Sequence, residues 1–367
     1  MEISESRVGI GPAQVVAGGA AFVLLTLGVF WYQFHRIPSG DAALWRDRLN
    51  WKYLFLILLC LPLETLAAGL RTWIVYRALQ PSVRAWTCLK AEWVNVALNT
   101  VTPSHLGGGP GQIYIFNREG VSVGRALTAS LLSFVGTMVG LLCLGVCSLI
   151  SPSTDAMRPL FEATVWTLVA MSAAMALAVT WPAGVQRALA WGSASLRRVK
   201  VSRDPLRDWW PPDAAPAGVP TVRVGRVAGR LLDLVCAYRA DVIRFVRAGK
   251  LGFVWVSLFG LVFLLSRALL AYLCVRFLGI EDFSMRHVIE IQMALIFLIF
   301  FAPTPGGAGL AEGASLVLMA PIVPVGIAPY YNLLWRFSTV YVWALAGILV
   351  LVRALLEDAR TFIHRRR

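Results

Sequence analysis

Charged side chains stand inside stretches that are otherwise apolar, where burial of charge is most costly. Glu64 and Arg71 share the stretch 53–79 and lie seven positions apart, hence on one face of a helix. Arg267 and Arg336 lie in later apolar stretches. Charges at such positions usually mark a working site. Because arginine binds phosphate through two parallel hydrogen bonds, Arg267 and Arg336 are candidates to bind a lipid phosphate.

Two clusters of proline and glycine interrupt apolar stretches. Their members are Pro103, Gly107, Gly109 and Gly111 in the first break and Pro305, Gly306, Gly307 and Gly309 in the second. Such residues end helices and free backbone N–H and C=O groups, which within hydrocarbon must be satisfied by protein or by a wet cavity. Paired broken helices are typical of transporters, which bind polar ligand groups there. Gln112 and Asn117 after the first break, and Glu312 after the second, are therefore candidates to line a polar path.

Each of these features also has a plain structural interpretation. The charges would form ion pairs, for example Glu64 with Arg71 or Glu312 with Arg336. Arg71 would alternatively extend its side chain to the membrane interface. The two breaks would be packing devices in a scaffold protein. The sequence leaves these alternatives open.

Enzyme and metal motifs are weak. The glycine cluster 107–111 lacks the Lys-Ser/Thr of a phosphate-binding loop, and no serine nucleophile elbow is present. The four histidines have no metal-ligand spacing: His35, His105, His287 and His364. We therefore predict no catalytic residue, no metal and no cofactor.

The elements that must position these residues are long apolar helices. Hydrophobic residues make up 58% of the chain, against about 45–50% in soluble domains. Six stretches approach the ~20 residues that cross a bilayer: 12–34, 53–79, 125–150, 161–181, 251–278 and 326–352. The sequence predicts one integral, multi-pass membrane domain over 1–367, in the cell (inner) membrane.

The two breaks are related by an internal offset of 202 residues, since 305 − 103 = 202. At this offset Pro103 meets Pro305 and, without gaps, further residues match: Gly107 with Gly309, Gly111 with Gly313 and Gly124 with Gly326. Recurring proline and glycine matches indicate a duplication. We predict a first repeat at 50–150 and a second at 251–353.

Basic residues predict the orientation of the two repeats. The loop 183–250 is rich in arginine and the chain ends in His364-Arg365-Arg366-Arg367, so both should be cytoplasmic. The repeats are then antiparallel. One fact opposes this orientation. Four basic residues would then lie on the side away from the cytoplasm: Arg36, Arg46, Arg48 and Lys52.

The predicted fold is an all-α membrane bundle with two inverted repeats. Each repeat contains a helix pair broken at Pro/Gly, either as a re-entrant hairpin or as two crossings. From Val224 the loop becomes a basic amphipathic helix, which lies on the cytoplasmic leaflet or packs against the bundle. The net charge of +14 fits anionic lipid headgroups better than nucleic acid.

Two motifs resemble the lysylphosphatidylglycerol synthase transmembrane-domain family, also called flippase-like. The first runs from Thr102 to Gln112, and the second from Pro303 to Glu312 with Arg336 in the last span. Members typically show Pro-Gly-Gly-x-Gly-x-x-Glu followed by this arginine. The resemblance covers about 50–352 and implies movement of a polar lipid between leaflets.

The first break departs from the family pattern. Gln112 stands where many members have an acid, and Ile115 stands near the place of an arginine. This difference bears on the charge of the ligand. The chain reaches Arg367 without the soluble aminoacyl-transferase domain of full-length synthases, so the resemblance does not imply lipid aminoacylation.

The sequence thus predicts a translocase for a phospholipid or other polar lipid, passive or ion-coupled, since no ATP site is visible. The alternative is an accessory subunit or intramembrane enzyme that presents a lipid-linked substrate to a partner transferase. The acids are dispersed rather than clustered at one membrane face, which favours transport over catalysis.

Overall fold

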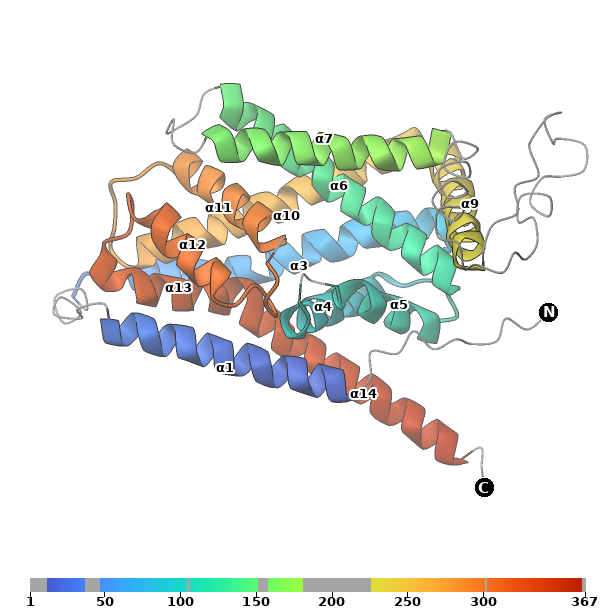
Figure 1. Ribbon diagram of the computed structural model, residues 1–367, viewed down its shortest axis with the longest axis horizontal. Coiled ribbons are helices and arrows are strands. Elements are labelled where there is room, and N and C mark those ends of the chain that lie inside the picture. The colour runs from blue at the N-terminus through green and yellow to red at the C-terminus, as the bar shows by residue number, and fades with distance from the viewer. Residues whose placement is uncertain are drawn as a thin grey trace, which may run out of the picture.

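The computed structural model describes residues 12–36, 47–103, 106–150, 158–180, 226–300 and 302–364 (Figure 1). Within these residues all regular structure is helical. The helices of the N-terminal part are α1 (Pro12–Arg36), α3 (Trp51–Leu79), α4 (Ala85–Val101), α5 (Gly108–Arg118), α6 (Val123–Ile150) and α7 (Arg158–Thr180). Those of the C-terminal part are α9 (Arg226–Ala248), α10 (Lys250–Phe277), α11 (Met285–Phe300), α12 (Leu310–Met319), η2 (Val325–Ile327), α13 (Ala328–Arg336), η3 (Phe337–Tyr341) and α14 (Val342–His364).

Five helical segments among the described residues are long and apolar enough to cross a membrane. They are Ala17–His35, Trp51–Leu79, Val123–Ile150, Leu251–Phe277 and Val325–Thr361. Helices suit this medium because every backbone bond is made within the segment. The protein is therefore a multi-pass membrane protein, as predicted. The sixth predicted span, 161–181, is helical as α7, and Phe161–Ala174 is the apolar part of it that the structure describes.

The centre of the bundle is the antiparallel pair α3 and α10. The N–H of Asn50, just before α3, donates to the C=O of Phe277 at the end of α10 over 2.9 Å. The ring of Trp51 meets that of Phe277 edge to face. The first helix of the predicted first repeat thus begins where its counterpart in the second repeat ends.

Small residues bring α6 close to α10. A Cβ on Gly260 would lie 2.6 Å from the carbonyl oxygen of Gly136, and one on Gly140 would lie 3.1 Å from Cα of Leu261. Gly136 and Gly140 are four positions apart, the spacing that lets membrane helices approach through their backbones. These glycines fix α6 against α10.

The first break produces a helical hairpin. The helix α5 turns back along α4, since Gly108 lies against Asn99 whereas Gly111 lies against Leu98 and Val94. Gly109 and Gly111 were predicted as part of the break, but α5 already begins at Gly108. The reason is packing: a Cβ on Gly111 would lie 2.6 Å from Leu98, so glycine is needed for the close approach of α5 to α4.

The second break joins α11 to α12 in the same way, and the two breaks meet. Pro103 and Pro305 face each other in an isolated antiparallel bridge. The two hairpins approach this point from opposite ends of the bundle (Figure 1). Unwound backbone from both breaks therefore meets about half-way along the long helices, where Gly306 and Gly307 are buried and Pro103 is exposed (Figure 1).

The helix α1 crosses this junction on one side. A methyl group on Gly18 would overlap the backbone of Val101, where α4 ends. Further along α1, the ring of Phe22 lies against Gly306 and against the ring of Tyr341. The same helix thus contacts both breaks (Figure 1).

The starts of two pairs of elements follow the 202-residue offset found in the sequence. The helix α5 begins at Gly108 and α12 at Leu310, and 310 − 108 = 202. Likewise α6 begins at Val123 and η2 at Val325, and 325 − 123 = 202. This register is what a duplication of the chain would produce.

The predicted basic helix after Val224 is present as α9. It lies across one end of the bundle, at the end toward which α14 also runs (Figure 1). Phe245 is buried, and Val242 packs on the same hydrophobic cluster. Of the two predicted positions, packing against the bundle is therefore observed. The part of the predicted loop before Arg226 lies outside the described residues.

Candidate functional site

Glu312 and Arg336 form a buried ion pair at the second break. Nε of Arg336 lies 2.6 Å from Oε1 of Glu312, and their side chains are 2% and 0% exposed. Nη2 of Arg336 also donates to the C=O of Gly306 over 3.0 Å. The ion-pair interpretation of these two residues is therefore confirmed. Arg336 stabilises the unwound backbone of the break directly.

The other oxygen of the Glu312 carboxylate caps α12. Oε2 accepts the N–H of Gly309 over 2.7 Å, which satisfies a backbone donor left free at the helix start. Gly306, Gly307 and Gly309 all have positive φ, between 60° and 85°. Other residues rarely adopt this conformation, which explains why the second break is built of glycine. Glu312 and Arg336 thus hold a sharply turned backbone in place.

A chain of polar contacts leads from this pair toward α1. Nδ2 of Asn332 donates to the C=O of Glu312 over 3.2 Å and lies 3.5 Å from Oε1 of Gln33. One turn away, the indole N–H of Trp335 donates to Oε1 of Gln292 over 3.2 Å. All of these side chains are buried. The second break therefore has a connected polar interior.

The first break is held by uncharged groups. The N–H of Gly108 donates to Oδ1 of Asn99 over 2.9 Å, and Asn99 in turn donates to Asn95. The N–H of Gly107 donates to the hydroxyl of Thr102 over 2.8 Å. These side chains replace the missing helical acceptors at the start of α5. The two breaks are thus stabilised differently, one by amides and a hydroxyl and the other by an ion pair.

Gln112 and Asn117 do not share a site. Oε1 of Gln112 accepts the hydroxyl of Ser130 on α6 over 3.0 Å, in the interior. Asn117 lies at the far end of α5 and donates to the C=O of Val121 over 3.2 Å, where it closes the turn after the helix. Gln112 therefore lies within the bundle near the first break, whereas Asn117 serves the connection to α6.

A second group of buried charges lies between α3, α4 and α10. Oε1 of Glu64 is 3.5 Å from Nη1 of Arg267, and Oε1 of Glu92 is 3.7 Å from Nη2 of Arg71. The predicted pairing of Glu64 with Arg71 is therefore wrong. Each acid instead pairs across a helix interface, because the packing of α3 on α10 and α4 brings opposite charges together.

An aromatic ring joins these two ion pairs. The guanidinium carbons of Arg71 and Arg267 lie 5.5 Å and 5.8 Å from the centre of the Phe263 ring. Arg71 also contacts the hydroxyl of Thr137, and Glu92 accepts that of Thr72 over 2.6 Å. Four charges thus form a neutral cluster in the bundle. Phe263 adds cation–π attraction to both arginines.

Arg71 and Arg267 differ in exposure. The side chain of Arg71 is 10% exposed and that of Arg267 is 24% exposed. Oε2 of Glu64, beside Arg267, is buried and has no hydrogen-bond partner in the described part of the protein. A buried carboxylate oxygen without a partner is costly. This cluster is therefore less completely satisfied than the pair at the second break.

The sequence missed several members of these networks. Glu92 stands inside the apolar stretch 85–101, and the rule that singled out Glu64 applies equally to it. Gln33 and Asn332 carry no charge, so only their positions in the fold connect them to Glu312. No signal in the sequence pointed to Phe263.

The sequence profile of the lysylphosphatidylglycerol synthase TM region matches residues 15–347. This range runs from α1 into α14 and includes both breaks and both charge clusters. No curated protein and no solved structure matches the chain.

Proposed function

The chain belongs to the lysylphosphatidylglycerol synthase transmembrane-region family, and from this premise we propose that it moves a polar or anionic lipid between the leaflets of a membrane. The observation that carries the proposal is the meeting of the two breaks at Pro103 and Pro305. Unwound backbone inside a membrane bundle is tolerated where it is packed by protein or lines a cavity. In transporters, such paired breaks form the binding site.

The arrangement of the halves supports the proposal. The helices α3 and α10 are antiparallel counterparts in the 202-residue register, and the two prolines that touch are counterparts as well. A two-fold axis in the membrane plane relates elements in this way. We propose that the chain is an inverted repeat whose two re-entrant hairpins meet at the midplane.

We assign contact with the lipid phosphate to Arg267. Its guanidinium is held by one ion pair of 3.5 Å and by the face of Phe263, and a quarter of its side chain is exposed. A phosphate that replaced Glu64 would gain two parallel hydrogen bonds from the guanidinium. Glu64 then acts as the counter-ion when no lipid is bound.

Arg336 is a positioning residue in this proposal. Its bonds to Glu312 and to the C=O of Gly306 leave it fully buried, so binding a headgroup would require the second break to open. Its removal should impair transport through loss of the break geometry. Gln112 lies on the opposite hairpin and contributes a neutral polar group to the path.

We place the protein in the cell membrane with α9 and the end of α14 in the cytoplasm. Both lie at one end of the bundle (Figure 1). The exposed basic residues Arg244 and Arg247 of α9 would face anionic lipid there.

The proposal is tested by lipid scrambling in liposomes that contain the purified chain. Fluorescent phosphatidylglycerol and phosphatidylcholine are compared, and a membrane-impermeant quencher reports the fraction in the outer leaflet. We expect wild type to equilibrate phosphatidylglycerol faster than protein-free liposomes do. Arg267→Gln should slow this roughly tenfold to a hundredfold, the effect of losing a charge-assisted hydrogen bond.

The matched control is Arg353→Gln, which removes an exposed arginine from α14. It should scramble at the wild-type rate. Absence of scrambling by wild type would contradict the proposal and favour the alternative, an accessory subunit that presents a lipid-linked substrate to a partner transferase. Equal rates for Arg267→Gln and wild type would remove Arg267 from the mechanism.

A further inference from the structure

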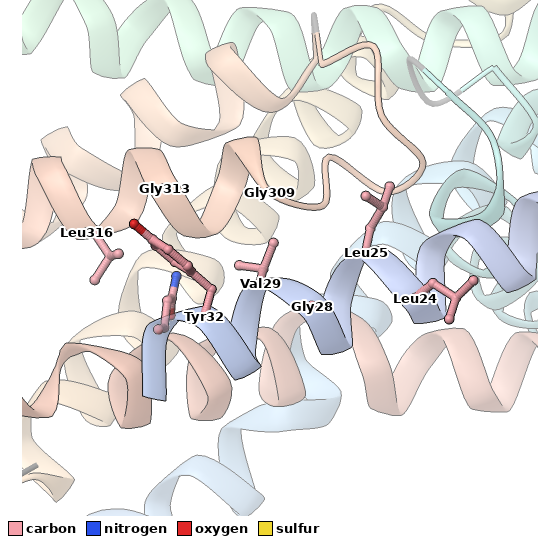
Figure 2. Close-up of a pocket in the computed structure, with 9 residues that line it drawn as sticks. Leu24, Leu25, Gly28, Val29, Tyr32, Gly309, Gly313 and Leu316 are labelled. Carbon is pink, nitrogen blue, oxygen red and sulfur yellow. The ribbon is translucent and has the colours of Figure 1, made fainter. Parts of the chain in front are cut away.

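A groove of about 390 Å³ runs between α1 and the start of α12 (Figure 2). Its lining is almost entirely apolar and consists of Leu24, Leu25, Gly28, Val29, Tyr32, Gln33, Gly309, Gly313 and Leu316. The groove is open on one side, between the candidate membrane span in α1 and the shorter apolar helix α12. Its volume lies in the usual range for small-molecule sites.

Two glycines on opposite walls keep the groove open. A Cβ on Gly28 of α1, or on Gly313 of α12, would meet no atom within 4 Å. The counterpart of Gly313 in the first half is Gly111, where a Cβ would lie 2.6 Å from Leu98. The groove is therefore a feature of the second half and of α1, which belongs to neither repeat.

The groove is polar at one end and apolar at the other. Leu24 and Leu25 lie at one end of the groove, close in sequence to Phe22, which contacts Gly306 of the second break, and Tyr32 lies at the other end (Figure 2). Gln33 follows Tyr32 and also lines the groove. Trp31, exposed beside them, marks that end as a membrane interface. From position 24 to 33 a helix rises about 14 Å, close to half of the ~30 Å hydrocarbon thickness. The groove thus spans one leaflet, from the interface to the midplane.

We propose that this groove binds one acyl chain of a phospholipid in that leaflet. A phospholipid has the same polarity gradient and length: its head lies at the interface and its tail ends at the midplane. The polar end of the groove connects with the second break, because Gln33 lies 3.5 Å from Asn332, which donates to the C=O of Glu312. A lipid seated here would hold its headgroup at the Gln33 end, which the Asn332 side chain connects to the backbone of Glu312.

This inference rests on the proposed function for its meaning, but its test requires no transport. Full-length protein in liposomes is irradiated with a phospholipid that carries a diazirine in one acyl chain. Labelled peptides are then mapped by mass spectrometry. We expect labelling to concentrate on the facing walls of α1 and α12.

Gly28→Leu and Gly313→Leu fill the groove from opposite walls, and a Cβ at either position meets no atom within 4 Å. Each should cause a several-fold loss of labelling in α1 and α12, with an unchanged thermal midpoint. If one variant fails to fold, the other still tests the groove. The control is Gly124→Leu on α6, where a Cβ also meets nothing within 4 Å. Labelling of α1 and α12 in this control variant should equal that in wild type.

Unchanged labelling in both groove variants, or labelling spread evenly over the lipid-facing helices, would overturn the proposal, since the contact would then be ordinary bilayer contact. Loss of labelling in the variants of a protein that does not scramble lipid would uphold the groove and reject the proposed transport. The two failures are therefore distinguishable.

Discussion

Pro103 and Pro305 face each other in an antiparallel bridge although 202 residues separate them. They are also counterparts in the internal register of the sequence. An antiparallel contact between equivalent residues is what a two-fold axis produces. The position of this bridge fixes where the two hairpins end, and it brings their unwound backbone to one place in the bundle.

The turn at the second break should depend strictly on glycine. At Gly306 φ is 60°, and a Cβ would lie 2.8 Å from the Phe22 ring. We expect Gly306→Ala to destabilise the protein by at least about 1–2 kcal/mol, the cost of a side chain in this backbone conformation. Thermal unfolding in detergent measures this.

Gly109→Ala is the matched control for that change. Gly109 lies within α5, and an added Cβ would meet nothing within 4 Å. Since alanine favours helix, we expect an unchanged or slightly higher stability, by up to about 1 kcal/mol. Equal destabilisation by both substitutions would contradict the account of the second break.

The Glu312–Arg336 pair should be far more important for stability than an exposed pair. Removal of one partner leaves a buried charge uncompensated, which typically costs about 3–5 kcal/mol. We therefore expect Glu312→Gln and Arg336→Gln each to lower stability strongly. Arg353→Gln, which breaks the exposed pair with Glu357, should have no measurable effect. A small effect of both buried substitutions would argue against this pairing.

The pairing in the charge cluster can be tested by double-mutant cycles. We expect coupling of about 0.5–3 kcal/mol between Arg71 and Glu92 and between Arg267 and Glu64, because these residues are in contact. The coupling energy between Glu64 and Arg71 should be smaller than the coupling energy of either of these two pairs. The measurement is the stability of single and double glutamine variants, and the reverse order of couplings would refute the observed pairing.

The approach of α6 to α10 should tolerate no side chain at Gly136. A Cβ there would lie 2.8 Å from the backbone oxygen of Val256. We expect Gly136→Leu to separate the helices and to abolish a monodisperse elution profile. Gly124→Leu lies on the same helix without a neighbour within 4 Å and should elute as wild type. Normal behaviour of both variants would show that the contact is not needed.

The sequence predicted the helices well because their cause is local. The apolar stretch 85–101 coincides with α4, and both breaks lie where proline and glycine placed them. Gly109 and Gly111 were assigned to the break because composition alone does not separate a glycine needed for a turn from one needed for close packing. The difference depends on Leu98 of the neighbouring helix.

Pairings of charges were less predictable. Glu312 and Arg336 were matched correctly, but Glu64 was matched with Arg71 because both lie on one helix face. In the structure the partner of Glu64 lies on α10 and that of Arg71 on α4. Spacing along one helix says which residues share a face, whereas the helix opposite that face is decided by tertiary packing.

The contact of α3 with α10 bears on how such a chain could have arisen. In the proposed inverted repeat, α3 meets its counterpart α10 in the opposite direction, which is the geometry of a symmetric dimer interface, where one surface recognises a copy of itself. A half-length ancestor with this surface could pair with a second copy inserted upside down. Joining two such genes would then preserve the assembly, and α1, α7 and α9, which lie outside the two predicted repeats, would have to be explained separately.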